Sequence, residues 1–384
     1  MVQVSHLALV EGPVYVPGLP REYVAERYGI PLDDIAKLGS AENPHGASPK
    51  AMAAIEEADR KLDIYPDWTA RPLREAIASR YGFEPDNIVC GSGETEVISM
   101  VIRAFAAPGE AILMHNPCFP IYRIYSACEG REALLTPMGE DFDPLLDDYV
   151  KRLEEKPRIA FITNPHNPSG VFLDEVQVRR ICEVSDKQTL VVLDEAYIHY
   201  SETDGLMKLL HEYDNLIVLR TFSKAFGLAG LRVGFGISSN PELIRPLLNI
   251  KPTWNMGQMQ IIGAAAAVFD DEHVARAVAT ISEARKHVTE QMAGMNSFRM
   301  VPGSRSNFFL TEILNPEIDS TDVFNGLLER GVIVKDGKDI EGLGGRYMRV
   351  DLNLRKHMDR FLSALRDIET SGAQRMDKSS ATPD

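Results

Sequence analysis

From Ser48 onward the chain alternates helix-like segments with short, wholly apolar runs. Apolar residues recur at helical spacing over residues 48–62, 69–81 and 95–105. Between the later helical segments lie apolar runs without polar alternation, at residues 111–114, 159–163, 190–193 and 216–219. Such runs are typical of strands buried on both faces, as in a parallel sheet covered by helices. The pattern therefore predicts a large α/β domain over residues 46–268.

The character of the chain changes after about residue 270. The hydrophobic spacing predicts a long charged helix over residues 273–295, a strand over 307–311 and a helix over 322–330. Two more strands are expected at 332–335 and 347–350, followed by a helix over 356–369. This profile predicts a smaller α+β domain over residues 269–370.

The ends of the chain have a different composition. Residues 1–45 begin with a Pro- and Gly-rich stretch, which predicts an irregular N-terminal arm whose remainder joins the small domain. Residues 371–384 are polar, and we expect a disordered tail there. The Ala-rich run at residues 263–269 is too short to span a membrane and predicts a buried helix.

Charge and cysteine content narrow the class of protein. The net charge of −15 argues against nucleic acid or an anionic membrane as partner, since both select basic patches. The four cysteines show neither CxxC spacing nor a nearby His pair, so we expect reduced thiols and no metal site. Residues 1–10 lack the pattern of a signal peptide, and a cytoplasmic location is expected.

Polar residues follow three of the apolar runs, where ligands bind in open α/β sheets. Asn167 lies in the segment after residues 159–163, Asp194 follows 190–193, and Lys224 comes shortly after 216–219. A lysine can form an imine with an aldehyde cofactor, and a buried carboxylate can keep a pyridine nitrogen protonated. The loop at residues 91–95 precedes a helix whose N-terminus suits a phosphate, and Arg232 could grip the same anion.

Each of these residues also has a purely structural interpretation. A single lysine such as Lys224 is usually a solvated charge, and Asp194 could cap a helix. Asn167 lies between prolines and could shape a turn. Phe119 and Tyr197 could belong to the core. The ordered set of motifs, rather than any one of them, favours the catalytic interpretation.

The motifs together resemble a known family. Residues 223–232 (SKAFGLAGLR) resemble the lysine motif of the fold-type I, class I/II aminotransferases. Residues 164–170 (NPHNPSG), 194–197 (DEAY), 38–46 (LGSAENPHG) and 65–67 (YPD) are most similar to the histidinol-phosphate aminotransferase branch. The resemblance runs from about Tyr15 to Leu365 and implies an aspartate aminotransferase-like fold: an α/β large domain with a mostly parallel sheet between helices, plus a smaller α+β domain.

The resemblance implies a role for each matching residue. Lys224 would form a Schiff base with pyridoxal phosphate and shuttle the α-proton, and Asp194 would pair with the pyridine nitrogen. Further cofactor contacts would be Asn167 and Tyr197 at the phenolic oxygen, Phe119 on the ring, and Glu94, Thr95, Thr221, Ser223 and Arg232 at the phosphate. Substrate contacts would be Tyr15, Asn43, Lys335 and Arg349. Tyr65 and the arm carrying Tyr15 would cross to the neighbouring subunit, which implies a homodimer.

The substrate positions depart from the family pattern. Lys335-Asp336 stands where that branch carries an Arg-Asp pair, and lysine binds phosphate only as a point charge. Ala41 and His166 replace asparagines, Cys118 replaces a threonine, and the segment after Arg349 lacks the usual Gly-Thr. These departures favour retained cofactor chemistry with an altered substrate.

The sequence leaves the reaction partly open. The expected activity is transfer of an amino group between an amino acid or amine and a 2-oxo acid. A decarboxylase or a cyclase of the same fold would use the same lysine to break another bond. A regulator that binds pyridoxal phosphate without catalysis is a more remote alternative, because no basic DNA-binding domain precedes Ala41.

Overall fold

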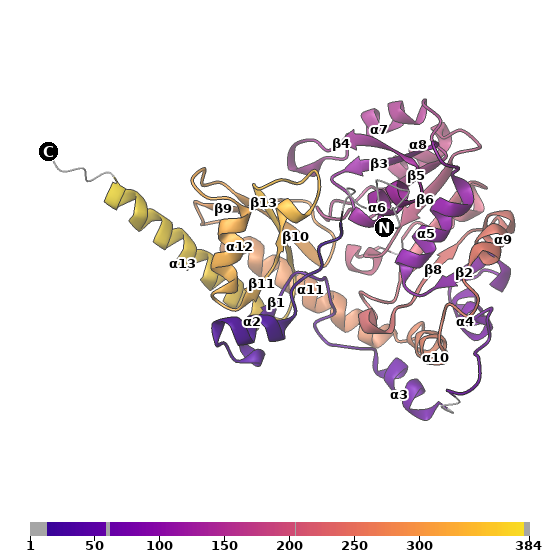
Figure 1. Cartoon of the computed structure of the whole chain (residues 1–384), viewed down its shortest axis with the longest axis horizontal. Coiled ribbons are helices and arrows are strands. Elements are labelled where there is room, and N and C mark those ends of the chain that lie inside the picture. The colour runs from indigo at the N-terminus through magenta and orange to yellow at the C-terminus, as the bar shows by residue number, and fades with distance from the viewer. Residues whose placement is uncertain (1–13, 59–61, 204, 380–384) are drawn as a thin grey trace, which may run out of the picture.

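The central element of the large domain is a seven-stranded, mostly parallel sheet with strand order β2-β8-β7-β6-β5-β3-β4. The computed structural model describes residues 14–58, 62–203 and 205–379 (Figure 1). Strands β3 to β7 are parallel where they pair, whereas β8 runs antiparallel to both β7 and β2. The strands are β2 (Ile88–Gly91), β3 (Ala111–Asn116), β4 (Glu132–Pro137), β5 (Ile159–Thr163), β6 (Leu190–Asp194), β7 (Leu216–Thr221) and β8 (Gly234–Ile237).

Helices cover both faces of this sheet, which explains why its strands carry no polar alternation. Every residue of β5, β6 and β7 is buried. One face packs on α5 (Glu94–Phe105), α6 (Pro120–Cys128) and α9 (Pro241–Ile250). The other face packs on α4 (Arg71–Tyr81), α7 (Leu146–Leu153), α8 (Glu175–Val184) and α10 (Gln258–Ala267). The four predicted apolar strands and the buried Ala-rich helix are confirmed; β2, β4 and β8 are additional strands.

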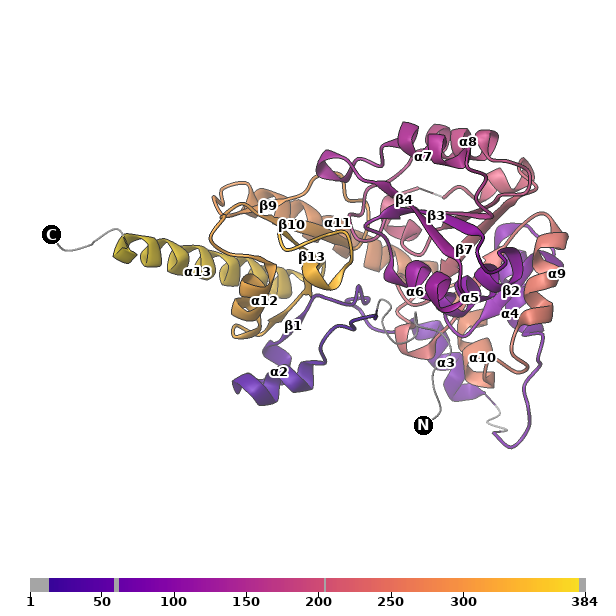
Figure 2. The same ribbon diagram turned by 45° about the horizontal axis from the view of Figure 1, so that its top comes forward.

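A second, antiparallel sheet of order β12-β13-β10-β9 forms the small domain. Its strands are β9 (Phe298–Met300), β10 (Phe308–Ile313), β12 (Lys335–Asp336) and β13 (Tyr347–Asp351). It shares a core with α11 (Asp271–Met292), α12 (Ser320–Leu328) and α13 (Arg355–Ser379). Figures 1 and 2 show this unit beside the large domain, with α11 extending toward it from the α10 side and the end of α13 projecting away from the body.

The N-terminal segment joins the small domain. Strand β1 (Ala36–Lys37) pairs in parallel with β11 (Val332–Ile333), and Val24 packs on Ile35 and Leu328. The helices here are α2 (Arg21–Tyr28) and α3 (Pro49–Glu57), the latter packed on α10. Short 3-10 helices lie at η1 (Leu32–Asp34), η2 (Pro85–Asn87), η3 (Glu140–Phe142), η4 (Ile198–Ser201), η5 (Met207–His211), η6 (Ala229–Leu231) and η7 (Gly337–Asp339).

Three details differ from the sequence prediction. The arm is not wholly irregular, because α2 carries helix-forming Glu and Ala residues and ends at Gly29 in the left-handed conformation (φ 66°). The strand expected at 332–335 is two short strands in different sheets, since β11 pairs with β1 and β12 with β13. Helix α13 continues through residues 371–379, where a disordered tail was expected. That segment contains the helix formers Ala, Gln, Arg, Met and Lys, which extend an already nucleated helix at little cost.

Candidate active site

The carboxyl ends of β5, β6 and β7 meet at one edge of the central sheet. Thr163 at the end of β5 is in register with Asp194 at the end of β6, and Asp194 is in register with Leu219 of β7. This edge forms one wall of a cavity of about 420 Å³. The predicted site residues that line it are Tyr15, Glu94, Thr95, Phe119, Asn167, Asp194, Tyr197, Thr221, Ser223, Lys224, Arg232 and Arg349.

Lys224 lies just beyond β7 with its ammonium directed at the cavity. Its Nζ donates a 3.1 Å hydrogen bond to the Ser40 carbonyl and lies 5.3 Å from the centre of the Tyr197 ring. Burial, aided by the positive charge of Arg349, lowers the pKa of Lys224 to about 8. A fraction of this amine is therefore neutral near neutral pH, which both a nucleophile and a proton-transfer group need.

Asp194 is the buried carboxylate at the end of β6. It accepts hydrogen bonds from the Tyr122 hydroxyl and from the Ala196 N–H, the latter at 3.0 Å. Burial raises the pKa of Asp194, and the Tyr122 hydrogen bond opposes that rise. Sequence reasoning missed Tyr122, which also contacts Thr163 at 2.9 Å. The available signal was its helical spacing of three residues from Phe119, whose ring it meets edge-on.

Another part of the cavity wall suits an anion. Helix α5 begins there after Gly93, and among the described residues no side chain caps its N-terminus. Arg232 donates from Nη1 to the Ser223 hydroxyl at 3.4 Å, and the Thr221 hydroxyl donates to the same oxygen at 3.0 Å. Gly93 (φ 82°) makes room for this arrangement, because a Cβ there would lie 2.2 Å from Nη2 of Arg232. An uncapped helix N-terminus, a guanidinium and two hydroxyls are groups that could hold a phosphate.

The small domain contributes a second guanidinium from β13. Arg349 donates from Nη1 to the Asn167 side-chain oxygen and from Nη2 to the Gly39 carbonyl, each at 3.1 Å. The Asn167 amide in turn donates to the Tyr197 hydroxyl at 3.4 Å. The residues expected at a cofactor ring and at a substrate anion thus form one hydrogen-bonded chain across the two domains.

Three predicted site residues lie outside the cavity. Asn43 donates to the Ala225 carbonyl at 2.8 Å and lines a separate groove. Lys335 is buried and donates to the Val16 carbonyl at 2.6 Å and to Asp339 at 3.0 Å. Tyr65 is 73% exposed and stacks on Trp254, with ring centroids 4.1 Å apart.

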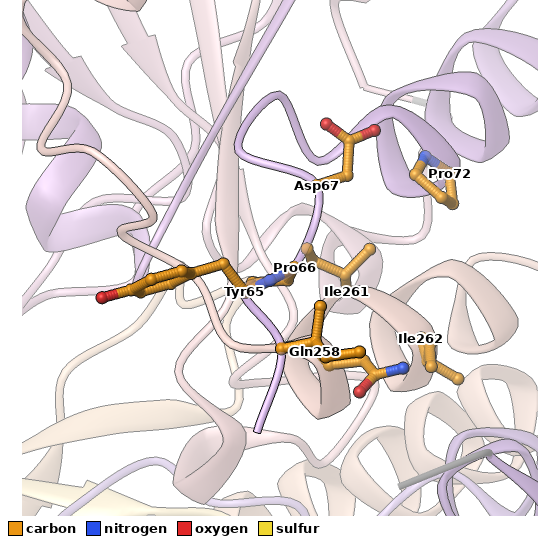
Figure 3. Close-up of a pocket in the computed structure, with 8 residues that line it drawn as sticks. Tyr65, Pro66, Asp67, Pro72, Gln258, Ile261 and Ile262 are labelled. Carbon is orange, nitrogen blue, oxygen red and sulfur yellow. The ribbon is translucent and has the colours of Figure 1, made fainter. Parts of the chain in front are cut away.

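Tyr65 borders a second cavity, of about 310 Å³, against α10. In Figure 3 its ring points away from Gln258, Ile262 and Pro72, which also line that cavity. Tyr15 was expected to reach the neighbouring subunit, but it lines the cavity of its own chain. The Lys335–Val16 bond explains this placement, because it fixes the arm next to Tyr15.

A lysine beyond a strand end, a buried carboxylate and an uncapped helix N-terminus on this sheet are the groups that a pyridoxal phosphate site requires. The family model "Aminotransferase class I and II" matches residues 33–365. The chain therefore belongs to the class I and II aminotransferases, and its cofactor is pyridoxal 5'-phosphate.

Relatives and solved structures agree with this assignment. The chain is 36% identical to a histidinol-phosphate aminotransferase of Anaeromyxobacter sp. (strain Fw109-5), covering 91% of this chain and 95% of that relative. It is 37% identical to histidinol-phosphate aminotransferase 1 of Mesorhizobium japonicum, covering 91% and 94%. The structure is similar to that of the Sinorhizobium meliloti histidinol-phosphate aminotransferase in complex with pyridoxal-5'-phosphate, with a TM-score of 0.83 at 24% identity over 96% and 99% of the two chains.

The described part of the chain contains neither a candidate membrane span nor a candidate metal-binding cluster. No helix there is both long and apolar enough to cross a membrane. Within the same residues, no group of three or more His, Cys, Asp and Glu side chains is arranged to hold a metal ion.

Proposed function

We propose that this aminotransferase moves an amino group between an anionic amino donor and a 2-oxo acid, with histidinol phosphate as the first donor to test. The observation that carries the proposal is the common cavity of Lys224, Asp194, Arg232 and Arg349. The names of the relatives suggest the donor. Lys335 stands where the histidinol-phosphate aminotransferase branch carries an arginine, so related anionic amines are the next donors to test.

The residues present fit the cofactor. The α5 N-terminus with Arg232, Ser223 and Thr221 would hold its phosphate, and Asp194 would hold a proton at its ring nitrogen. The cofactor supplies an aldehyde for imine formation and a ring that withdraws electrons from the reacting carbon. Lys224 would hold the cofactor covalently and would move the substrate's α-proton, because its lowered pKa leaves part of the amine unprotonated.

Arg349 is the proposed contact for the substrate's anionic group. Its guanidinium lies at the cavity with Nε buried, and no hydrogen-bond acceptor for Nε exists among the described residues. Two of its other donors already hold Asn167 and Gly39 in place. Asp351 lies 3.7 Å from Nη2 and offsets part of the charge, and the rest of the Arg349 charge at the cavity favours an anion there.

The activity is tested by a half-reaction with the full chain loaded with pyridoxal phosphate. L-Histidinol phosphate and L-glutamate are added separately, and absorbance is followed while the amines are analysed. We expect the lysine-bound cofactor band to disappear with donor and to return with a 2-oxo acid, and Lys224→Ala to abolish both changes. Release of carbon dioxide, or no response to any amine in a broad panel, would show that the proposal is wrong.

We further propose a homodimer in which Tyr65 completes the partner's cofactor site. Tyr65 lies outside its own chain's cavity, and Ile64, Trp68 and Trp254 near it are exposed apolar side chains. Mixing inactive Lys224→Ala and Tyr65→Ala chains should restore activity, because one site of the hybrid then has both residues intact. Absence of any recovery in hybrids that form would contradict the crossing of Tyr65.

A further inference from the structure

Two buried carboxyl groups contact each other in the cavity. Glu94 is the first residue of α5 and is 8% exposed, whereas Asp194 is the last residue of β6 and is 2% exposed. Both side chains line the same cavity, and a side-chain hydrogen bond between them raises the pKa of Glu94 and lowers that of Asp194. Two interacting carboxylates that are buried this deeply cannot both be charged without a large electrostatic cost.

The hydrogen-bond donors around the pair are unequally distributed. Asp194 accepts from the Tyr122 hydroxyl and from the Ala196 N–H. By contrast, Oε1 of Glu94 is buried and receives no hydrogen bond from the described residues. Donors stabilise an anion, so Asp194 is the member of the pair that bears the charge and Glu94 is the member that bears a proton.

The surrounding charges leave this assignment unchanged. Lys224 and Arg232 face Glu94 from the segment after β7 and act to lower its pKa. Burial and the neighbouring Asp194 outweigh them and raise the pKa of Glu94 well above its usual range. Other titratable groups among the described residues that interact with the pair are the Tyr122 and Tyr197 hydroxyls and Glu195, and Glu195 is itself paired with Arg220 at 2.6 Å.

We propose that Glu94 is a positioning residue that stays protonated and donates its carboxyl hydrogen to the Asp194 carboxylate. This donor would hold the anion in one orientation and lower its affinity for a proton. Any effect of this donor on the protonation of the cofactor's ring nitrogen rests on the proposed function. The proton itself is a property of the chain and can be measured without any amino donor.

The first test compares the wild type with Glu94→Gln as cofactor-free, full-length protein. Glutamine keeps a neutral donor but cannot titrate. A glutamic acid that is neutral when folded and ionised when unfolded makes unfolding easier as pH rises above about 4.3, its unfolded pKa. Relative to Glu94→Gln, the wild-type unfolding constant should rise by about tenfold per pH unit between pH 5 and pH 7. A ratio that does not change with pH would overturn the proposal.

Infrared spectroscopy gives a second test, which does not require the wild type and the variants to be equally stable. The wild type at pH 7 should show a protonated carboxyl C=O stretch that both Glu94→Gln and Glu94→Ala lack. Persistence of the band in both variants would assign the proton to another group and overturn the proposal.

Kinetics of the loaded enzyme separates a positioning role from a merely structural one. Glu94→Ala removes the donor and should lower kcat by about tenfold with KM within about twofold, whereas Glu94→Gln should retain kcat within about threefold. Equal losses in the two variants would show that the donor hydrogen bond is not what matters. If no donor is turned over at all, the stability and infrared tests still decide the location of the proton.

Discussion

Lys335 Nζ donates a 2.6 Å hydrogen bond to the backbone carbonyl of Val16, so this buried ammonium fixes the N-terminal arm to β12. Its second bond is to Asp339 at 3.0 Å, and Lys335 is not among the residues that line the cavity. Tyr15, the neighbour of Val16, lines the cavity. Lys335 therefore acts on the site through the arm, whereas its family counterpart is expected to contact the substrate.

Replacing Lys335 by methionine should release the arm. We expect KM to rise by about three- to tenfold for donors with and without a phosphate, because loss of one charged hydrogen bond affects both equally. Steady-state kinetics with the two donor types measures this, and faster proteolysis within the arm is an independent readout. Lys338→Met is the matched control, since Lys338 is exposed and pairs with Asp319. A KM increase confined to the phosphate-bearing donor would instead indicate direct contact with substrate.

Arg349→Lys should lower kcat/KM by about 100-fold, because an ammonium cannot reproduce a planar fork that holds Asn167, Gly39 and an anion together. The measurement is kcat/KM with the identified donor. Arg355→Lys, at an exposed residue paired with Asp359, should stay within about twofold of wild type. Similar losses in both variants would mean that the cavity position of Arg349 is unimportant.

Two glycines of the lysine motif should respond differently to alanine. Gly227 has φ 68°, and a Cβ there would lie 1.8 Å from the Gly46 carbonyl oxygen, so Gly227→Ala should lower the free energy of unfolding by about 3 kcal/mol. No described atom lies within 4 Å of a Cβ on Gly230. Gly230→Ala should therefore change the free energy of unfolding by less than about 0.5 kcal/mol. Urea denaturation of both variants checks the contrast, and equal stability would contradict the backbone contact.

Buried histidines should make the fold sensitive to acid. Burial lowers the pKa of His166 to about 3 and that of His115 to about 4. Both stay neutral in the folded chain while the unfolded chain takes up protons, so stability is lost as pH falls from about 6.5 toward those values. His166→Asn should reduce the loss of unfolding free energy between pH 7 and pH 5 by about 2 kcal/mol, measured by urea denaturation. The exposed His211→Asn is the control, and a wild-type pH dependence in His166→Asn would contradict this account.

The sequence predicted the strands and strand-end residues well, because their signal is local. The runs at 159–163 and 190–193 are short and almost wholly apolar, which is typical of a strand buried on both faces. Asn167, Asp194 and Lys224 follow such runs and therefore meet at one edge of the sheet. Tyr122 was not predicted, since only the packing of α6 on β5 and β6 directs its hydroxyl to Asp194.

By itself the sequence determined the family, the cofactor and the order of the site residues along the chain, because each motif is a short run with its own backbone geometry. Only the tertiary structure decided which distant residues touch. Arg349 meets Asn167 across 182 positions, Lys335 meets Val16 across 319, and Glu94 faces Asp194 from another element. Those contacts depend on how the domains and the arm pack, and a hydrogen bond between residues so far apart leaves no local pattern in the chain.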